Sequence, residues 1–351
     1  MKLNFVCPEL SGNGGTETVL VKALNHLSEN NQIKLYLTSI PENRVWLGQM
    51  NPNIIIKEIK RNTKFDKMVM LLKTFSSAKN DEYFIVLGAT IIKLAAFVRK
   101  VFLKKWPIIS WIHYSLINQD MFDPKNIKLA DQHWAISTPI KHQLMDLGIP
   151  ENKIHLILNP VSKYNGSLNV SDDSSMLRLV YVGKVMLHGQ KNLIELFDGV
   201  SKYSQRIHVD LFGADTSDGE VFSYIKKLKI TDKCTFHGWL KNPWEKIVNE
   251  IHPNALVLTS KYEGLPMVMI EAMERGIPCL VADFSGYEDV LIEKVNGFVY
   301  KSGNTSDLAD KIYLLKEKIF SANLVHESVK KFEDPKYFER LDQAVSKIGE
   351  L

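Results

Sequence analysis

Residues 255–282 read ALVLTSKYEGLPMVMIEAMERGIPCLVA, and this stretch decides the fold. It opens with a short apolar run at 255–258, passes through a glycine- and proline-containing turn, and closes with a second apolar run at 279–282. The segment around Glu271 and Ala272, between the turn and the second run, is predicted to be helical. A strand, a helix and a strand in this order predict two parallel strands joined by a helical crossover.

The same alternation of short apolar runs and helical segments continues in both directions from this stretch. It predicts parallel sheets with helical crossovers, which is an α/β class with doubly wound, Rossmann-like domains. The remaining expected strands are 3–6, 33–37, 54–56, 84–87, 108–112, 133–136, 155–158, 177–182, 207–212, 235–237 and 298–300.

A polar stretch without an apolar period, SKYNGSLNVSDDSSM at 162–176, interrupts the pattern and indicates a domain boundary. We therefore expect an N-terminal domain at 1–160, a linker at 161–177 and a C-terminal domain at 178–335. Residues 336–351 should form a last helix. Spacing alone does not show which domain that helix contacts, and we predict that it crosses back to the N-terminal one. In two such domains the carboxyl ends of the strands should face a ligand crevice.

The composition fits a protein of two α/β domains that is not embedded in a membrane. The chain has 351 residues, of which 45% are hydrophobic and 24% charged, and only three cysteines. The cysteine spacing suits neither disulfides nor a zinc site, so we expect small buried side chains. The start MKLNFVCPEL lacks the long apolar run of a signal peptide, and a cytoplasmic location is expected.

Charge is distributed unevenly between the halves. Residues 1–160 contain 20 Lys and Arg against 13 Asp and Glu, whereas the remainder contains 24 against 27. Basic residues at 57–67 and 99–105 alternate with apolar and aromatic ones, which suits attachment to an anionic membrane surface. Two solvated helix faces explain the pattern equally well. Nucleic acid is not an expected partner, because no nucleic-acid-binding module accompanies the basic residues.

The turn TSKYEGLP at 259–266 is the strongest candidate for a binding site. A glycine-containing turn before a helix presents backbone N–H groups that can hold a diphosphate. Glu263 on the turn and Glu271 about two helical turns later can accept hydrogen bonds from vicinal hydroxyls at the two ends of one ligand. The plainer interpretation is an acidic capping residue followed by an ordinary surface glutamate.

Three weaker candidates follow other expected strands. Lys184 and Lys191, seven residues apart after Gly183, could neutralise one diphosphate. Gly14 and Gly15, in the turn SGNGGTE, permit close approach of a phosphate but lack the order of a dinucleotide site. His113 follows 108–112 and could bind a hydroxyl, although most single histidines are structural.

Several chemistries lack their sequence signals. No D-x-D pair, Walker A motif or G-x-S-x-G elbow occurs, and no cluster of histidine, cysteine and carboxylate residues has metal-ligand spacing. We therefore expect a reaction that needs no metal and no cofactor.

Taken in order, these motifs resemble the retaining glycosyltransferases of family four, which have the two-domain GT-B fold. The resemblance covers nearly the whole chain and rests on GGTE, HWAISTPIKHQL, NPV, YVGK, FHGW, NPWE, EGLPMVMIEAMERGIPCLVAD and NGFVY. Within that family the chain is most similar to the 1,6-galactosyltransferases of the lipopolysaccharide core. The resemblance implies transfer of a hexose, galactose first, from a UDP-sugar to a hydroxyl of a glycan or glycolipid.

Site residues are implied by the same resemblance. His113, Lys184, Lys191 and Glu263 would be catalytic, and Lys184 stands where the family often has an arginine. Pro266 offers no N–H, so a backbone contact to the sugar would have to come from a neighbour. The donor-binding residues would be Gly14, Gly15, Gly183, Lys184, Lys191, Trp239, Glu263, Gly264, Leu265, Met267, Val268 and Glu271.

Two other functions suit the same fold. A sugar-nucleotide epimerase would need acid and base carboxylates and no acceptor. A glycan-binding or chaperone subunit would bind without catalysis, and it would have no use for a complete diphosphate site.

Overall fold

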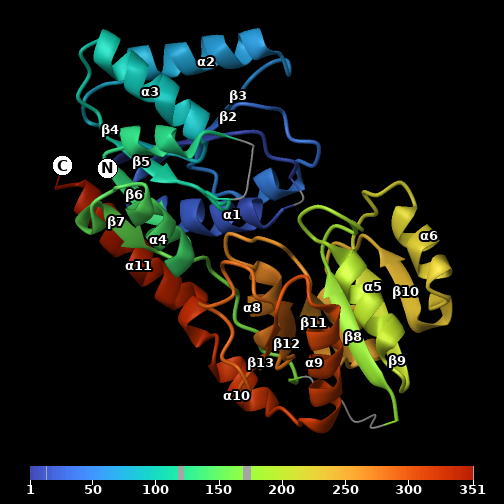
Figure 1. Ribbon diagram of the computed structural model, residues 1–351. Helices are drawn as coiled ribbons and strands as arrows, with labels where there is room; N and C mark the ends of the chain where they lie inside the picture. The colour runs from blue at the N-terminus through green and yellow to red at the C-terminus, as the bar shows by residue number, and fades with distance from the viewer. Residues whose placement is uncertain (13, 118–121, 169–174, 351) are drawn as a thin grey trace. The chain divides into compact units, whose positions relative to one another are not determined.

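The computed structural model describes residues 1–12, 14–117, 122–168 and 175–350, which form two compact units (Figure 1). Unit 1 consists of residues 1–160 together with 334–351, and unit 2 consists of residues 161–333. Residues 161–168 and 175–177, which we expected in a linker, thus belong to unit 2. Each unit is described by itself below.

Unit 1 is built on a seven-stranded parallel sheet of order β3-β2-β1-β4-β5-β6-β7. The central strand β1 is buried along nearly its whole length, as expected for a strand covered on both faces. The strands are β1 (Lys2–Cys7), β2 (Gln32–Leu37), β3 (Ile55–Glu58), β4 (Glu82–Val86), β5 (Ile108–Trp111), β6 (Gln132–Ala135) and β7 (Ile154–Leu156). The helices are α1 (Gly15–Leu27), α2 (Lys64–Ser77), α3 (Ala89–Val101), α4 (Thr138–Asp146) and α11 (Asp334–Ile348), with short 3-10 turns η1 (Val45–Gln49), η2 (Pro124–Leu129) and η3 (Glu151–Lys153).

Unit 2 has a six-stranded parallel sheet of order β10-β9-β8-β11-β12-β13. Its strands are β8 (Leu177–Val182), β9 (Ile207–Phe212), β10 (Cys234–Gly238), β11 (Ala255–Leu258), β12 (Cys279–Ala282) and β13 (Gly297–Tyr300). Its helices are α5 (Leu193–Lys202), α6 (Glu220–Lys227), α7 (Pro243–Lys246), α8 (Met267–Met273), α9 (Thr305–Glu317) and α10 (Ala322–Glu327), with η4 (Thr231–Lys233), the π-helical η5 (Ile247–Ile251) and η6 (Lys330–Phe332).

Both sheets share the strand order of doubly wound nucleotide-binding domains. In each, the chain builds outward in one direction and then returns to the other side of its first strand. Ligands of such sheets bind beyond the carboxyl ends of the strands, where this order reverses. That position lies next to β1 and β4 in unit 1 and next to β8 and β11 in unit 2.

The sequence-based expectation of thirteen parallel strands is confirmed, with ends that differ by one or two residues. Ser137 caps α4, because its side-chain oxygen accepts a hydrogen bond from the Ile140 N–H. Cys7 and Cys279 are buried as expected, whereas Cys234 is half-buried. Among the described residues, no helix is long and apolar enough to cross a bilayer.

The last helix, α11, contributes to the core of unit 1. It packs on α1, where the His26 ring stacks on Phe338 and its Nε2 lies 2.9 Å from Asp342 Oδ1. Arg340 Nε donates to the Ile157 carbonyl, just after β7, at 2.9 Å. The final segment of the sequence is therefore part of the same unit as the first.

Because Leu341 of α11 is fully buried, its truncation should destabilise unit 1. We expect Leu341→Ala to lower the free energy of unfolding by about 2–5 kcal/mol, through lost apolar burial and the cavity left behind. Urea unfolding followed by circular dichroism measures this change. The matched control is Leu324→Ala, whose side chain is 59% exposed and should cost less than about 0.5 kcal/mol. Equal effects of the two substitutions would contradict the packing of α11.

Candidate functional site

The turns after β8 and β11 meet at the carboxyl edge of the unit 2 sheet. β8 and β11 pair in parallel, so both strands end on the same side. The Lys261 N–H donates to the Gln190 carbonyl at 2.8 Å, and Thr259 Oγ1 donates to the Lys191 carbonyl at 2.9 Å. These hydrogen bonds hold together two loops that are about 70 residues apart in the sequence.

Lys191 and Glu263, which sequence reasoning assigned to different parts of a ligand, are bonded to each other. Lys191 Nζ lies 2.6 Å from Glu263 Oε1, and the two side chains are only 17% and 13% exposed. The other carboxylate oxygen, Oε2, accepts a hydrogen bond from Gln190 Nε2 at 3.3 Å. The arrangement fixes a half-buried cation at the point where the strand order reverses. Such a cation can transfer its hydrogen bonds from the carboxylate to an incoming anion.

Lys184 stands on a turn that requires glycine at two positions, Gly183 and Gly213. Gly213, after β9, has a φ of +149°, and a Cβ there would lie 1.8 Å from the Gly183 carbonyl oxygen. Gly183 itself has a φ of +154°, and Tyr181 Oη donates to the Lys184 carbonyl at 2.7 Å. These contacts fix the backbone of Lys184, while its side chain is exposed. Sequence reasoning named Gly183 but missed Gly213, whose role follows only from the contact between the turns.

Glu271 of α8 is oriented by two residues that sequence reasoning did not select. Trp244 Nε1 donates to Glu271 Oε2 at 2.9 Å, and Arg275 Nη1 donates to the Glu271 backbone carbonyl at 2.7 Å. The Arg275 guanidinium also lies over the Trp244 ring, 5.0 Å from its centroid. Trp244 belongs to the NPWE motif and Arg275 follows Glu271 by four residues, so a helical spacing rule could have found the second.

The remaining donor-site candidates of unit 2 differ in exposure. Trp239, directly after β10, is 53% exposed and available for stacking, whereas Leu265 is buried. Pro266 precedes α8, which spans only seven residues, Met267–Met273. A helix of two turns offers a weaker dipole than the sequence led us to expect. Gly264, Met267 and Val268 are partly exposed in the same segment.

In unit 1, the turn after β1 is organised by Glu17. Glu17 Oε1 accepts a hydrogen bond from the Gly12 N–H at 2.6 Å, and its side chain is buried. A Cβ at Gly14 would lie 2.9 Å from Glu17 Oε2, so a larger residue there would require the Glu17 side chain to shift. Gly15 begins α1 and is exposed. Sequence reasoning selected both glycines but missed the acidic residue that closes the turn.

His113 lies just past β5, with its ring 4.6 Å from that of Trp111. Its Nε2 is buried and has no hydrogen-bond partner among the described residues. Burial lowers the pKa of His113 to about 3, because the charged imidazolium would be desolvated. The imidazole is therefore neutral at ordinary pH, and a neutral ring can bind a hydroxyl through either nitrogen.

A carboxylate and histidine cluster lies elsewhere in unit 2. Glu274, His326 and Glu333 approach one another although 52 residues separate the first two in the sequence. Sequence spacing did not indicate this cluster, because α8, α10 and the segment after η6 bring its members together only in the folded unit.

Comparison with known proteins shows a matching domain model and relatives that align over nearly the whole chain. Residues 174–331 match the family model of glycosyl transferases group 1. The lipopolysaccharide 1,6-galactosyltransferase of Escherichia coli strain K12 is 29% identical over 98% of both chains. The solved structure of the lipopolysaccharide outer core galactosyltransferase WaaB in its apo form is 28% identical, superposes with a TM-score of 0.86 and covers 99% of both chains.

A more distant structure has the same fold. Anabaena Alr3699/HepE in complex with UDP is 15% identical and superposes with a TM-score of 0.80, covering 99% of this chain and all of the other. The chain therefore has a group 1 glycosyltransferase domain at residues 174–331 and the GT-B fold of two Rossmann-like domains, and its relatives support a hexosyltransferase enzyme.

Proposed function

We propose that the chain moves a hexose from a UDP-sugar to a hydroxyl of a cell-surface glycan or glycolipid, with retention of the anomeric configuration. Galactose is the first choice of sugar, since the Escherichia coli relative is a lipopolysaccharide 1,6-galactosyltransferase and the structural relative WaaB is an outer core galactosyltransferase. UDP is the first choice of nucleotide because the structure with the same fold, HepE, is a complex with UDP. The Lys191–Glu263 pair is the observation that carries the proposal.

The pair suits a diphosphate because it holds the Lys191 ammonium group in place while leaving it partly open to solvent. An arriving diphosphate carries more negative charge than one carboxylate, so Lys191 can turn from Glu263 toward it. Lys184, exposed on its fixed turn, supplies a second cation. Glu263, relieved of Lys191, can then accept a hydrogen bond from a sugar hydroxyl.

Glu271 is proposed to hold the ribose. A carboxylate accepts hydrogen bonds from two vicinal hydroxyls, and Trp244 fixes its orientation by donating to Oε2. Exposed Trp239 provides an apolar face of the size that a nucleotide base requires.

The transfer itself is proposed to rely on charge stabilisation. As the bond between the sugar and the diphosphate breaks, negative charge grows on the leaving oxygen, where Lys184 and Lys191 stabilise it. That oxygen can take the proton of the attacking acceptor hydroxyl, so no separate base is required. Because the two lysines supply the positive charge, no metal ion or other cofactor is assigned to this step. His113 of unit 1 is proposed to bind a sugar hydroxyl as a neutral donor.

A donor screen tests this function. Thermal shifts are measured with UDP-galactose, UDP-glucose, UDP-N-acetylglucosamine and GDP-mannose, and we expect the largest shift with UDP-galactose. Incubation with the preferred donor alone should give slow hydrolysis to UDP and sugar. Isomerised donor would instead indicate an epimerase, and the absence of any shift would favour a binding or chaperone subunit.

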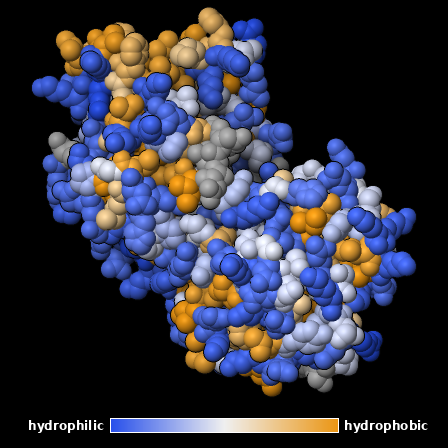
Figure 2. Space-filling view, in the orientation of Figure 1, coloured by the Kyte–Doolittle hydropathy of each residue, from blue (hydrophilic) through white to orange (hydrophobic). Residues whose placement is uncertain are grey.

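We also propose that unit 1 binds an anionic membrane surface through the outer faces of α2 and α3. Figure 2 shows apolar side chains gathered over the part of unit 1 where Figure 1 places these packed helices. Phe65 is 72% exposed and Phe97 is 61% exposed, and Lys64 and Lys100 are exposed on the same helices. Aromatic rings flanked by lysines complement a bilayer of anionic lipids, such as the inner face of the plasma membrane.

Not every basic residue of this region is available for lipid. Arg99 pairs with Asp131, and Lys104 Nζ donates to the Ala78 carbonyl at 2.9 Å. The membrane surface is therefore assigned to the exposed lysines of α2 and α3 and not to the whole basic run at 99–105.

For the transferase site, we expect Lys191→Ala to lower kcat by about 10²–10³, because the charge that stabilises the leaving diphosphate is lost. Release of UDP from UDP-galactose in the presence of acceptor measures this, and circular dichroism should show an intact fold. The control is Lys227→Ala, which removes an exposed lysine at the end of α6. Near-normal turnover of the Lys191 variant would contradict the proposed role of Lys191 in stabilising the leaving diphosphate.

For His113, stability should depend on pH in a defined direction. In the unfolded chain the imidazole gains a proton as pH falls through about 6.5, whereas in the folded chain it stays neutral until about 3. The folded state therefore loses stability as pH falls below about 6.5. His113→Asn removes this effect, so its free-energy deficit relative to the parent should shrink by about 1–2 kcal/mol between pH 7.5 and pH 5. Urea unfolding at both values checks this, and a constant deficit would contradict it.

For the membrane surface, the double variant Phe65→Ala and Phe97→Ala should reduce binding to phosphatidylglycerol vesicles about tenfold or more, since two rings no longer enter the bilayer. Cosedimentation at low and high salt measures the binding. Phe222→Ala on α6, a residue 48% exposed in unit 2, is the matched control. If the parent protein does not bind these vesicles, the two helices are simply solvated faces.

A further inference from the structure

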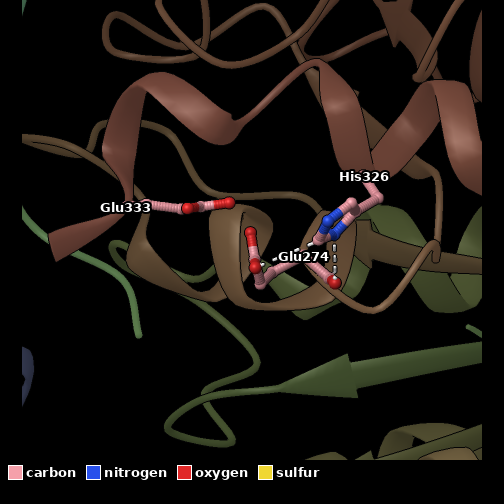
Figure 3. Close-up of side chains that lie close together, drawn as sticks. All are labelled: Glu274, His326 and Glu333. Carbon is pink, nitrogen blue, oxygen red and sulfur yellow. Dashed lines mark hydrogen bonds and ion pairs between the residues drawn. The ribbon is translucent and has the colours of Figure 1, made fainter. Parts of the chain in front are cut away.

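Three side chains of metal-ligating type converge in unit 2 (Figure 3). Glu274 follows α8, His326 lies in α10, and Glu333 follows η6. Each offers one ligand atom, and these atoms all lie within 4.8 Å of one another. Figure 3 shows the Glu274 carboxylate between the other two side chains.

Glu274 is fully buried yet incompletely hydrogen-bonded. Its Oε1 accepts from the Tyr164 N–H at 2.9 Å, but its Oε2 is buried and has no hydrogen-bond partner among the described residues. Oε1 of Glu333 is likewise buried without a partner in the described part of the chain. Two carboxylates side by side with unsatisfied oxygens are costly unless a positive charge lies between them.

The nearby lysine and arginine side chains form no ion pair with either carboxylate within the described part of the chain. Arg275 lies over the Tyr164 and Trp244 rings and donates to the Glu271 carbonyl, while Lys330 pairs with Glu327 at 2.5 Å. Both cations therefore attract Glu274 only from beyond ion-pair distance.

His326 is held beside Glu274, with its Nδ1 3.7 Å from Glu274 Oε1. Its Nδ1 lies 2.7 Å from the Glu274 backbone carbonyl, which can only accept, so Nδ1 carries the proton. This leaves Nε2 as the nitrogen with a lone pair. A ring N–H held by a backbone carbonyl is the usual way in which a ligating histidine has its tautomer fixed.

We propose that Glu274, His326 and Glu333 bind one divalent transition-metal ion, with zinc as the first choice. Two carboxylate oxygens and one imidazole nitrogen are a donor set that zinc accepts with a water as fourth ligand. Magnesium and calcium prefer six or more oxygen ligands and should bind less well. The site would add a function to the transferase and takes no part in its chemistry.

The position of the cluster suggests what the ion does. Val161 is the first residue of unit 2 after the chain leaves unit 1, and Glu333 is the last residue of unit 2 before the chain returns to unit 1. The two are paired, and the Val161 N–H donates to the Phe332 carbonyl at 2.8 Å. A bound ion would tie both crossing segments to the end of α8. Close packing of α8 on α10 prepares the site, since a Cβ at Gly276 would lie 2.8 Å from Ala322 Cβ.

Zinc binding by the full, tag-free chain tests the proposal. The protein is treated with a chelator, exchanged into buffer without nucleotide-sugar and titrated with zinc chloride. We expect one zinc per chain by elemental analysis after gel filtration, and a rise in melting temperature of about 5 °C or more at saturation. Glu333→Gln should weaken binding at least about tenfold, and Glu274→Gln and His326→Asn should do the same.

The control is Glu317→Gln, which removes an exposed carboxylate at the end of α9 in the same unit and should leave zinc binding unchanged. If Glu274→Gln fails to fold, Glu333→Gln decides, because Glu333 is only half-buried. Unchanged zinc binding in Glu333→Gln would overturn the proposal. A parent protein that takes up no zinc would also overturn it. If Glu274→Gln is then more stable than the parent, the two carboxyl groups share a proton. No donor is used, so neither result bears on the transferase function.

Discussion

In unit 2, β8 and β11 pair in parallel although about 70 residues separate them in the sequence, so the turns after both strands leave the same edge of the sheet. The contacts between the turns after β8 and β11 depend on that pairing. It places Gln190 and Lys191 against Tyr262 and Glu263, and the hydrogen bond from the Lys261 N–H to the Gln190 carbonyl then fixes their spacing. A shift of either strand by one residue would reverse its side chains and separate the pair.

The partial burial of the Lys191–Glu263 pair suits it to separate when a charged ligand binds. A fully exposed pair contributes little because water screens it, and a fully buried one resists separation because each charge would be left unpaired. Side-chain exposures of 17% and 13% lie between these limits. In the proposed exchange, Gln190 would stay bonded to Glu263 while Lys191 turns toward the ligand, which reduces the cost of leaving that carboxylate without its cation. The partial burial of the pair thus suits a site that binds and releases a charged ligand.

The sequence predicted the strands well because apolar runs and turn residues are local signals. All thirteen strands and the last helix follow from them, as do the positions of Lys184 and Lys191 in the segment after β8, of Glu263 in the turn after β11 and of Glu271 in the helix that follows. Side-chain partners could not be predicted in the same way. Glu263 meets Lys191 and Glu271 meets Trp244 only after the sheet has formed, and Gly213 is needed only because another turn passes within reach of its missing Cβ.

Arg275 contacts both the surroundings of Glu271 and those of Glu274 in unit 2. Its guanidinium contacts the ring of Trp244, whose Nε1 donates to Glu271, and the ring of Tyr164, whose backbone N–H donates to Glu274. Any movement of the segment after Val161 that displaces Tyr164 therefore acts on Arg275, and through it on the orientation of Glu271. The proposed ribose contact and the segments that connect the two units thus share one stacked side chain. This gives a physical route by which a change at the chain crossings can alter the donor site without any residue of the site being replaced.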